Sequence, residues 1–136
     1  MAEGIDPDFL LGFFDRMLEA VRSQDPNQVA ALCTEDVVFD DAGPERLLVG
    51  REALIELLGA LYKVADDIEV EIIDRYVSLE SAVAAARWQT KGTLRDPAGR
   101  PARLETAEFY EFRDGLISHW TFMVRDRDWL GRQWGG

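Results

Sequence analysis

Apolar residues recur at spacings of three and four in the N-terminal half of the chain, and this spacing predicts three helices. The first helix spans residues 6–23 and the second residues 25–33, and each begins with an Asp-Pro pair. An aspartate caps a helix start, and a proline fits the first turn because that position needs no backbone donor. The third helix begins at Gly50 and reaches about Tyr62.

After Asp66-Asp67 the period changes, and apolar residues alternate with polar ones. Alternation is typical of strands that have one buried face. The segment 104–126 contains Asp114-Gly115 between two alternating runs, which is a strong hairpin signal. The predicted strands are residues 37–41, 68–76, 81–94 and the two arms of 104–126, and the predicted loops are 42–49 and 95–103.

The length of the hairpin turn decides which side chains share a face of the sheet. A two-residue turn pairs Phe112 with Ile117, whereas a three-residue turn with a left-handed Gly115 pairs Phe112 with Leu116. We expect the three-residue turn, because it separates an apolar face from a charged one. The apolar face then contains one carboxyl group, that of Glu108.

The order of these elements is helix, helix, strand, helix and then four strands. Helices followed by a run of antiparallel strands indicate an α+β fold. We expect a cone-shaped, curved antiparallel or mixed sheet wrapped over three N-terminal helices (ααβαββββ), in a single domain of residues 1–136. The open end of such a cone is a suitable place for a small apolar ligand.

The charged face of the hairpin also carries apolar residues. Phe109, Ile117 and Met123 fall on this outer face in the expected register. A patch of that size predicts a homodimer formed through the outer face of the sheet. His119 falls on the same face and is expected to lie on the surface or in the dimer contact.

The charge and the cysteine count exclude several classes of function. The chain has a formal net charge of −11, which argues against nucleic-acid and anionic-membrane partners. A single cysteine and a single histidine argue against a disulfide, a cysteine-based metal cluster and a histidine-rich metal site. We therefore expect no metal and no cofactor. The N-terminal segment lacks a basic leader, so the cytoplasm is the expected location.

Asp41 and Glu108 are the candidate catalytic residues. Asp41 ends a strand whose Val37 and Phe39 point to the same side, so it is expected where the apolar face meets the open end of the cone. Loss of solvation there raises a carboxyl pKa toward that of a general base, although a solvated loop aspartate fits the sequence too. Glu108 is expected to be either a protonated hydrogen-bond donor or part of a salt bridge.

The partners of a Glu108 salt bridge would be Arg87, Lys91 or Arg103. The strand that carries Arg87 also leaves two orientations open. Trp88 points inward and Arg87, Gln89 and Lys91 point outward if the alanines mark the apolar face. The reverse orientation places Arg87 and Gln89 inside as an anchor for an anion or a carbonyl.

Two blocks of sequence carry a resemblance to a known group of proteins. The segment ALCTEDVVFDDAGPERLLVGREALIELL (30–58) resembles the part of ketosteroid isomerases in which a short strand carries the catalytic aspartate. The segments RWQTKGTL (87–94) and FYEFRDGLISHW (109–120) are similar to SnoaL-like polyketide cyclases. The chain thus resembles the nuclear-transport-factor-2-like superfamily.

The resemblance implies roles for individual residues. Asp41 matches the position of the isomerase base, and Glu108 matches that of a neutral acid that donates to the oxyanion. Met17 stands where the isomerases have a tyrosine, and Leu94 stands where many cyclases have a histidine. Thr121 and Phe122 stand where cyclases and epoxide hydrolases tend to have an aspartate. The residues expected to line the substrate pocket are Met17, Leu58, Tyr62, Trp88, Tyr110, Trp120 and Phe122.

Two functions from different classes remain. The first is a cofactor-independent enzyme that abstracts a proton from, isomerises or cyclises a small hydrophobic carbonyl or polycyclic molecule. The second is a non-catalytic ligand-binding or dimerisation module of the same fold. They differ in whether the two carboxyl groups share one cavity that solvent can reach.

Overall fold

The computed structural model describes residues 6–42 and 46–124. Its three helices are α1 (Pro7–Arg22), α2 (Pro26–Ala30) and α3 (Arg51–Tyr62). Asp6 and Asp25 cap the first two, and each carboxylate accepts a hydrogen bond from the backbone N–H two residues later, at 2.9 and 3.0 Å. The Asp-Pro pairs therefore begin these helices as the sequence predicts.

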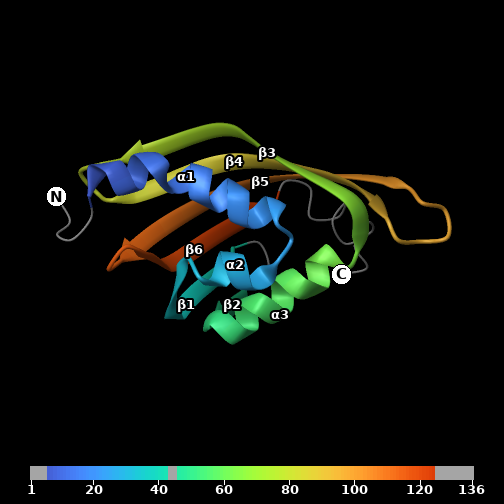
Figure 1. Cartoon of the computed structure of the whole chain (residues 1–136), viewed down its shortest axis with the longest axis horizontal. Coiled ribbons are helices and arrows are strands. Elements are labelled where there is room, and N and C mark those ends of the chain that lie inside the picture. The colour runs from blue at the N-terminus through green and yellow to red at the C-terminus, as the bar shows by residue number, and fades with distance from the viewer. Residues whose placement is uncertain (1–5, 43–45, 125–136) are drawn as a thin grey trace.

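Six strands form one curved, mixed sheet that does not close (Figure 1). Their order across the sheet is β2-β1-β6-β5-β4-β3, and β1 is parallel to β6 while the other neighbours are antiparallel. The three helices lie on the concave face. This arrangement confirms the predicted α+β cone. The strands are β1 (Cys33–Asp41), β2 (Arg46–Val49), β3 (Ala65–Ser78), β4 (Val83–Leu94), β5 (Pro101–Arg113) and β6 (Leu116–Val124).

Several element boundaries differ from the prediction, among them those of β3, which runs from Ala65 to Ser78 instead of over residues 68–76. Strand β2 occupies part of the predicted loop 42–49, because its mostly exposed residues on the sheet edge show no alternation. Strand β1 begins at Cys33, which the sequence placed in the second helix; α2 ends at Ala30 after one turn. Strand β5 begins at Pro101 inside the predicted loop 95–103, because Pro101 pairs with Thr93 and extends the hairpin.

The turn between β5 and β6 is shorter than predicted. Asp114 and Gly115 both have positive φ angles (54° and 75°), so they form a two-residue turn in which Phe112 pairs with Ile117. A bulge follows, because Glu111 pairs with His119 and Ser118 has no partner position. Because of the bulge, residues 119–124 point to the same faces of the sheet as they would with the predicted three-residue turn.

One consequence corrects the predicted outer patch. Ile117 lies before the bulge and is fully buried in the core, so it does not belong to the outer face. Phe109 and Met123 remain on that face and are 41% and 44% exposed.

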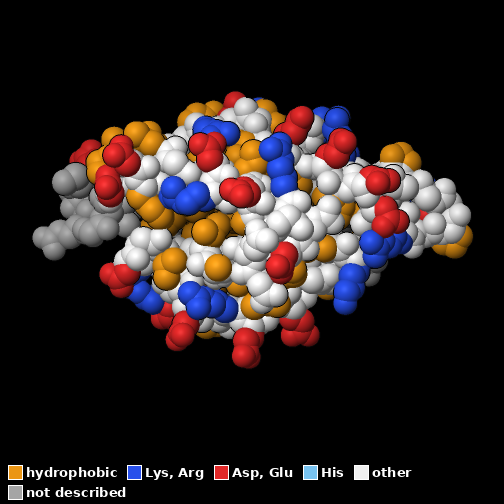
Figure 2. Space-filling model, viewed as in Figure 1, with side chains coloured by type: hydrophobic (Ala, Val, Ile, Leu, Met, Phe, Trp, Pro, Cys, Tyr) orange, Lys and Arg blue, Asp and Glu red, His pale blue; other side chains and the backbone are white. Residues whose placement is uncertain are grey.

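The core fills the space between the concave face and the helices. Phe13 and Phe14 of α1 meet Tyr110 of β5, with ring centroids 5.0 and 5.9 Å apart. Burial of such large rings is the main favourable contribution to folding. Figure 2 shows acidic and basic side chains interspersed over one face of the molecule.

Candidate functional site

Asp41 and Glu108 lie in one row across the concave face of the sheet. Each stands directly opposite Phe122, Asp41 on the parallel neighbour β1 and Glu108 on the antiparallel neighbour β5. Residues directly opposite one another across adjacent strands point to the same face, and two strand spacings separate the backbones by about 10 Å. Both residues are buried, with exposed fractions of 3% and 7%. Phe122 lies between them.

The Glu108 carboxylate accepts hydrogen bonds from three neutral side chains. Tyr110 Oη and Trp120 Nε1 donate to Oε1 at 2.9 and 2.8 Å, and Thr106 Oγ1 donates to Oε2 at 2.6 Å. Burial raises the pKa of Glu108 above its ordinary value, and the three hydrogen bonds oppose that rise without cancelling it. The glutamate thus has an increased tendency to hold a proton.

These contacts determine which oxygen carries the proton when Glu108 is neutral. Oε1 already accepts two hydrogen bonds, one of them from an indole nitrogen that can only donate. Oε2 accepts one, from the Thr106 hydroxyl, which can also act as an acceptor. A proton on Oε2 therefore fits the network, because the Thr106 hydroxyl can accept it.

A salt bridge to Glu108 was the alternative expectation. Within residues 6–42 and 46–124, no arginine or lysine forms an ion pair with this carboxylate. Arg87 instead pairs with Asp74 at 2.7 Å and Glu105 at 3.8 Å on the outer face. A salt bridge from Arg87 is therefore wrong for this structure.

The strand β4 has the orientation that its alanines indicate. Trp88 is buried on the concave face, whereas Arg87 and Lys91 are exposed on the other side. Gln89 shares the outer face with them but is buried, at a position directly opposite Glu71 and Glu105 of the neighbouring strands. The reverse orientation, with Arg87 inside, does not occur.

Asp41 has a charged partner. Arg46 of β2 stands opposite it in the antiparallel pair, and its Nη2 lies 3.3 Å from Asp41 Oδ2. The two carboxyl groups of the row therefore have different surroundings: a cation contacts Asp41, whereas neutral donors contact Glu108.

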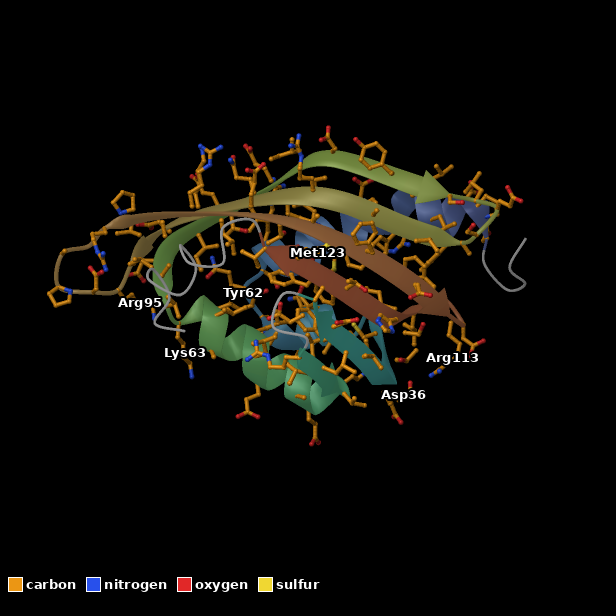
Figure 3. The ribbon with its side chains drawn as sticks, turned by 180° about the vertical axis from the view of Figure 1, so that it is seen from behind. Asp36, Tyr62, Lys63, Arg95, Arg113 and Met123 are labelled. Atoms are coloured by element: carbon orange, nitrogen blue, oxygen red, sulfur yellow. The ribbon has the colours of Figure 1, made fainter. Side chains whose placement is uncertain are left out.

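The predicted pocket residues divide into two groups. Tyr62 and Phe122 are partly exposed and pack against the core. Burial and then the charge of Glu108 raise the pKa of Tyr62 to about 12, and its side chain lies between the end of α3 and the sheet (Figure 3). The others are buried in the core itself: Met17, Leu58, Trp88, Tyr110 and Trp120.

Two of the cavities in the described part of the chain lie away from the carboxyl row, and neither Asp41 nor Glu108 lines them. One of about 460 Å³ lies at the turn end of the β5–β6 hairpin, where Thr34, Asp36, Arg51 and Arg113 line it. The other, of about 350 Å³, lies beside Arg87, Thr106 and Met123. A hydrophobic pocket over the carboxyl row thus stays a prediction. The sequence did not indicate the hairpin-end cavity, because its residues come from three separate segments.

His119 lies on the outer face, as its register in the sheet requires. It stands between Glu111 and Val38 on the neighbouring strands, and its Nε2 lies 3.5 Å from Asp40 Oδ2. This position separates it from Glu108 and Asp41, which point to the concave face.

No group of three or more metal-ligating side chains occurs in the part of the chain that the structure describes. In the same part, no helix is long and apolar enough to cross a membrane.

Comparison with known proteins gives one family match. The model of the SnoaL-like domain matches residues 14–120. No curated protein matches the chain.

Several solved structures share the fold at low sequence identity. PrhC from Penicillium brasilianum NBRC 6234 is 18% identical with a TM-score of 0.78, over 92% of this chain and 87% of that one. SalBIII, an epoxide hydrolase/cyclase-like enzyme with a role in pyran ring formation in the polyether salinomycin, is 14% identical with a TM-score of 0.77, over 90% and 95%. A hypothetical protein with a ketosteroid isomerase-like fold from Catenulispora acidiphila DSM 44928, in complex with trimethylamine, is 16% identical with a TM-score of 0.74, over 96% and 95%. At these identities the likeness shows the fold alone.

Proposed function

The chain belongs to the SnoaL-like domain family, and from that premise we propose that it is an enzyme that moves a proton on a small hydrophobic carbonyl compound. Asp41 is the general base and Glu108 is the neutral acid that donates a hydrogen bond to the substrate oxygen. The reaction class is proton abstraction beside a carbonyl, with isomerisation or ring closure as its outcome.

The proposed steps use only side chains of this chain. The ionised Asp41 carboxylate takes a proton from the carbon next to the carbonyl, and the electron pair moves to the carbonyl oxygen. The proton on Glu108 Oε2 forms a hydrogen bond to that oxygen while its charge develops. Asp41 then returns its proton to another carbon, which gives an isomer. Alternatively, the enolate carbon attacks a second carbonyl group and closes a ring, and the proton on Asp41 passes to the alkoxide that forms. These steps require no cofactor.

One observation gives the main support for Asp41 as the base and Glu108 as the acid. Two buried carboxyl groups occupy the same row of the concave face and have different partners. Acid and base roles separate when the environments of two carboxyl groups move their pKa values apart. Burial raises the pKa of Glu108, and a cation contacts Asp41.

Hydrogen–deuterium exchange tests the proposal without knowledge of the natural substrate. The protein is incubated in D₂O with a panel of cyclic and polycyclic ketones, and the proton signals beside each carbonyl are followed by NMR. We expect accelerated exchange for at least one ketone, a loss of roughly 10²–10⁴-fold in Asp41→Asn and a loss of roughly 10²-fold or more in Glu108→Ala.

Asp40→Asn is the matched control. Asp40 is the preceding residue of the same strand, and its side chain points to the opposite face beside His119. This variant should exchange ketone protons at the wild-type rate. Equal losses in Asp40→Asn and Asp41→Asn would contradict the role of Asp41 as base.

The hydrogen-bonding of Glu108 also favours a second candidate function. Both of its oxygens already have partners inside the protein, which is the pattern of a structural polar network. In that case the chain is a ligand-binding or dimerisation module without catalysis. Ketones that bind, seen by shifts of protein NMR signals, without any exchange of their protons would favour this second function.

We also propose that the chain forms a homodimer through the outer face of the sheet. Phe109 and Met123 support this partner, because both are exposed on adjacent strands of that face. A cytoplasmic location remains the prediction from the sequence.

A further inference from the structure

We infer that Phe122 is the specificity-determining residue of the carboxyl row: its ring stands between Asp41 and Glu108 and limits the ketones that contact both carboxyl groups to small ones. The ligand class is a ketone of about one ring, and a fused-ring ketone is disfavoured. The reaction of the bound ketone rests on the proposed function, whereas the size limit on binding does not.

The position of Phe122 follows from the pairing of three strands. Phe122 stands directly opposite Asp41 of the parallel neighbour β1 and directly opposite Glu108 of the antiparallel neighbour β5. Residues opposite one another point to the same face, and adjacent strands lie about 4.8 Å apart. A ligand that contacts both carboxyl groups must therefore cross the place of this ring.

Ring contacts show that the Phe122 side chain points to the concave face. Its ring centroid lies 5.5 Å from that of Phe39, with an angle of 39° between the two planes. Phe39 is buried in the core, and its ring also meets that of Trp120 at 5.3 Å. Phe122 thus belongs to the aromatic layer beside the carboxyl row.

Phe122 differs from the other aromatic residues near Glu108 in burial and in hydrogen bonding. Tyr110 and Trp120 are 0% and 5% exposed, and both donate hydrogen bonds to Glu108 Oε1. Phe122 is partly exposed, and its side chain has no polar atom, so packing alone holds its rotamer. Rotamer changes are fast in exposed side chains. Phe122 is therefore the ring that an incoming ligand can push aside.

The volume of the phenyl ring sets the limit on ligand size. Neither of the two cavities described above is lined by Phe122 or by the carboxyl groups beside it. Packed protein interiors leave few voids larger than a water molecule. The second ring of a fused-ring ketone would need the volume that the phenyl ring fills, whereas a single-ring ketone needs only part of it.

Two ketones of different size test the inference. The dissociation constants of cyclohexanone and of β-tetralone, which has an additional fused ring, are measured by shifts of protein NMR signals in the wild type and in Phe122→Ala. We expect the preference for β-tetralone over cyclohexanone to rise by roughly tenfold or more in the variant, because one methylene in an apolar pocket already changes discrimination by about 10–200-fold. An unchanged preference overturns the inference.

Phe112→Ala is the matched control. Phe112 is also a partly exposed ring that packs against the core, and it lies on the same strand as Glu108. Its ring meets Phe9 and Phe13 of α1, at 5.3 and 4.9 Å. This variant should keep the wild-type preference between the two ketones. An equal rise in Phe112→Ala and Phe122→Ala would reflect a general loosening of the core and would overturn the role of Phe122.

Two further variants decide the question if Phe122→Ala does not fold. Phe122→Leu reduces the volume of the side chain, and Phe122→Trp increases it. The preference for β-tetralone should rise in Phe122→Leu and fall in Phe122→Trp. A preference that moves in the same direction in both variants, or in neither, overturns the inference.

Hydrogen–deuterium exchange separates the size limit from the proposed function. If the preference shifts and no ketone exchanges its protons in any variant, the size limit stands and the proposed function fails. If ketones exchange their protons but the preference is the same in the wild type and Phe122→Ala, the proposed function stands and the size limit fails. Absence of binding of both ketones to all of these proteins also overturns the size limit.

Discussion

The indole nitrogen of Trp120 donates a 2.8 Å hydrogen bond to Glu108 Oε1, although the residue directly opposite Glu108 on β6 is Phe122. The bond runs diagonally between neighbouring strands, and Tyr110 Oη donates a second hydrogen bond to the same oxygen. Two donors therefore fix one oxygen of the carboxylate as an acceptor in every protonation state. This arrangement leads to the first prediction.

Glu108→Gln should retain the stability of the protein better than Glu108→Ala. The Gln oxygen can take the place of Oε1, and its amide can face the Thr106 hydroxyl, so every donor keeps a partner. Alanine removes all three acceptor contacts, and we expect a loss of roughly 3 kcal/mol or more, since each unsatisfied buried group costs about 1–3 kcal/mol. Urea unfolding measures both variants. Equal midpoints for the two would show that these hydrogen bonds add little.

The pH dependence of stability should show the raised pKa of Glu108. A group whose pKa is higher in the folded state stabilises the fold fully below its unfolded pKa, near 4.5, and this contribution is lost as the pH rises through the folded pKa. Relative to Glu108→Gln, the wild type should therefore lose stability as the pH rises above about 4.5. Urea unfolding at a series of pH values tests the sign. A wild-type advantage that grows with pH would contradict it.

Cys33 should not react with thiol reagents while the protein is folded. Its side chain is buried, and burial raises the pKa of the thiol to about 12. At pH 8 a thiol with that pKa is ionised in only about one molecule in 10⁴, and the thiolate is the reactive form. Reaction with Ellman's reagent should begin only when urea unfolds the chain. Rapid labelling in the absence of denaturant would show that β1 opens locally at Cys33.

Gly115→Ala should destabilise the hairpin by about 1 kcal/mol, because a non-glycine residue at positive φ is strained. An added Cβ would meet no atom within 4 Å, so the backbone strain is the whole effect. Gly115→Asn should cost less, since asparagine tolerates this conformation. Thermal unfolding compares the three proteins. Identical melting temperatures for Ala and Asn would mean that the turn adjusts its φ angle.

Charged substitutions on the outer face should dissociate the proposed dimer. Phe109→Lys combined with Met123→Lys places two cations in the middle of the apolar patch, and sedimentation velocity should then give a monomer. Leu11→Lys is the control, because Leu11 is exposed on α1 and lies off the sheet. A monomeric wild type would remove the dimer from the proposal.

Local sequence signals were sufficient for the starts of α1 and α2 and for the inward orientation of Glu108. Asp6-Pro7 and Asp25-Pro26 begin α1 and α2 because capping and proline geometry depend on adjacent residues only. Glu108 was recognisable as one charged residue in an alternating apolar run, and the structure buries it. Alternation determines the face of a side chain wherever no bulge intervenes.

The remaining features depend on contacts between distant segments. The bulge at Ser118 buries Ile117, and neither follows from the Asp114-Gly115 signal. Strand β2 has no alternating pattern, because most of it is exposed at the edge of the sheet. For this reason the contact between Arg46 and Asp41 could not be expected from the sequence. Gln89 is buried on the outer face, where the pattern alone predicts an exposed residue.

The parallel pairing of β1 with β6 also determines when the carboxyl row can exist during biosynthesis. Residue 41 finds its partner only at residue 122, so the ribosome must release the chain as far as residue 122 before the row assembles. Closure of such long loops slows folding, and an incomplete nascent chain exposes the unpaired edge of β1 to other molecules. The carboxyl row is therefore one of the last features of the sheet to form during synthesis.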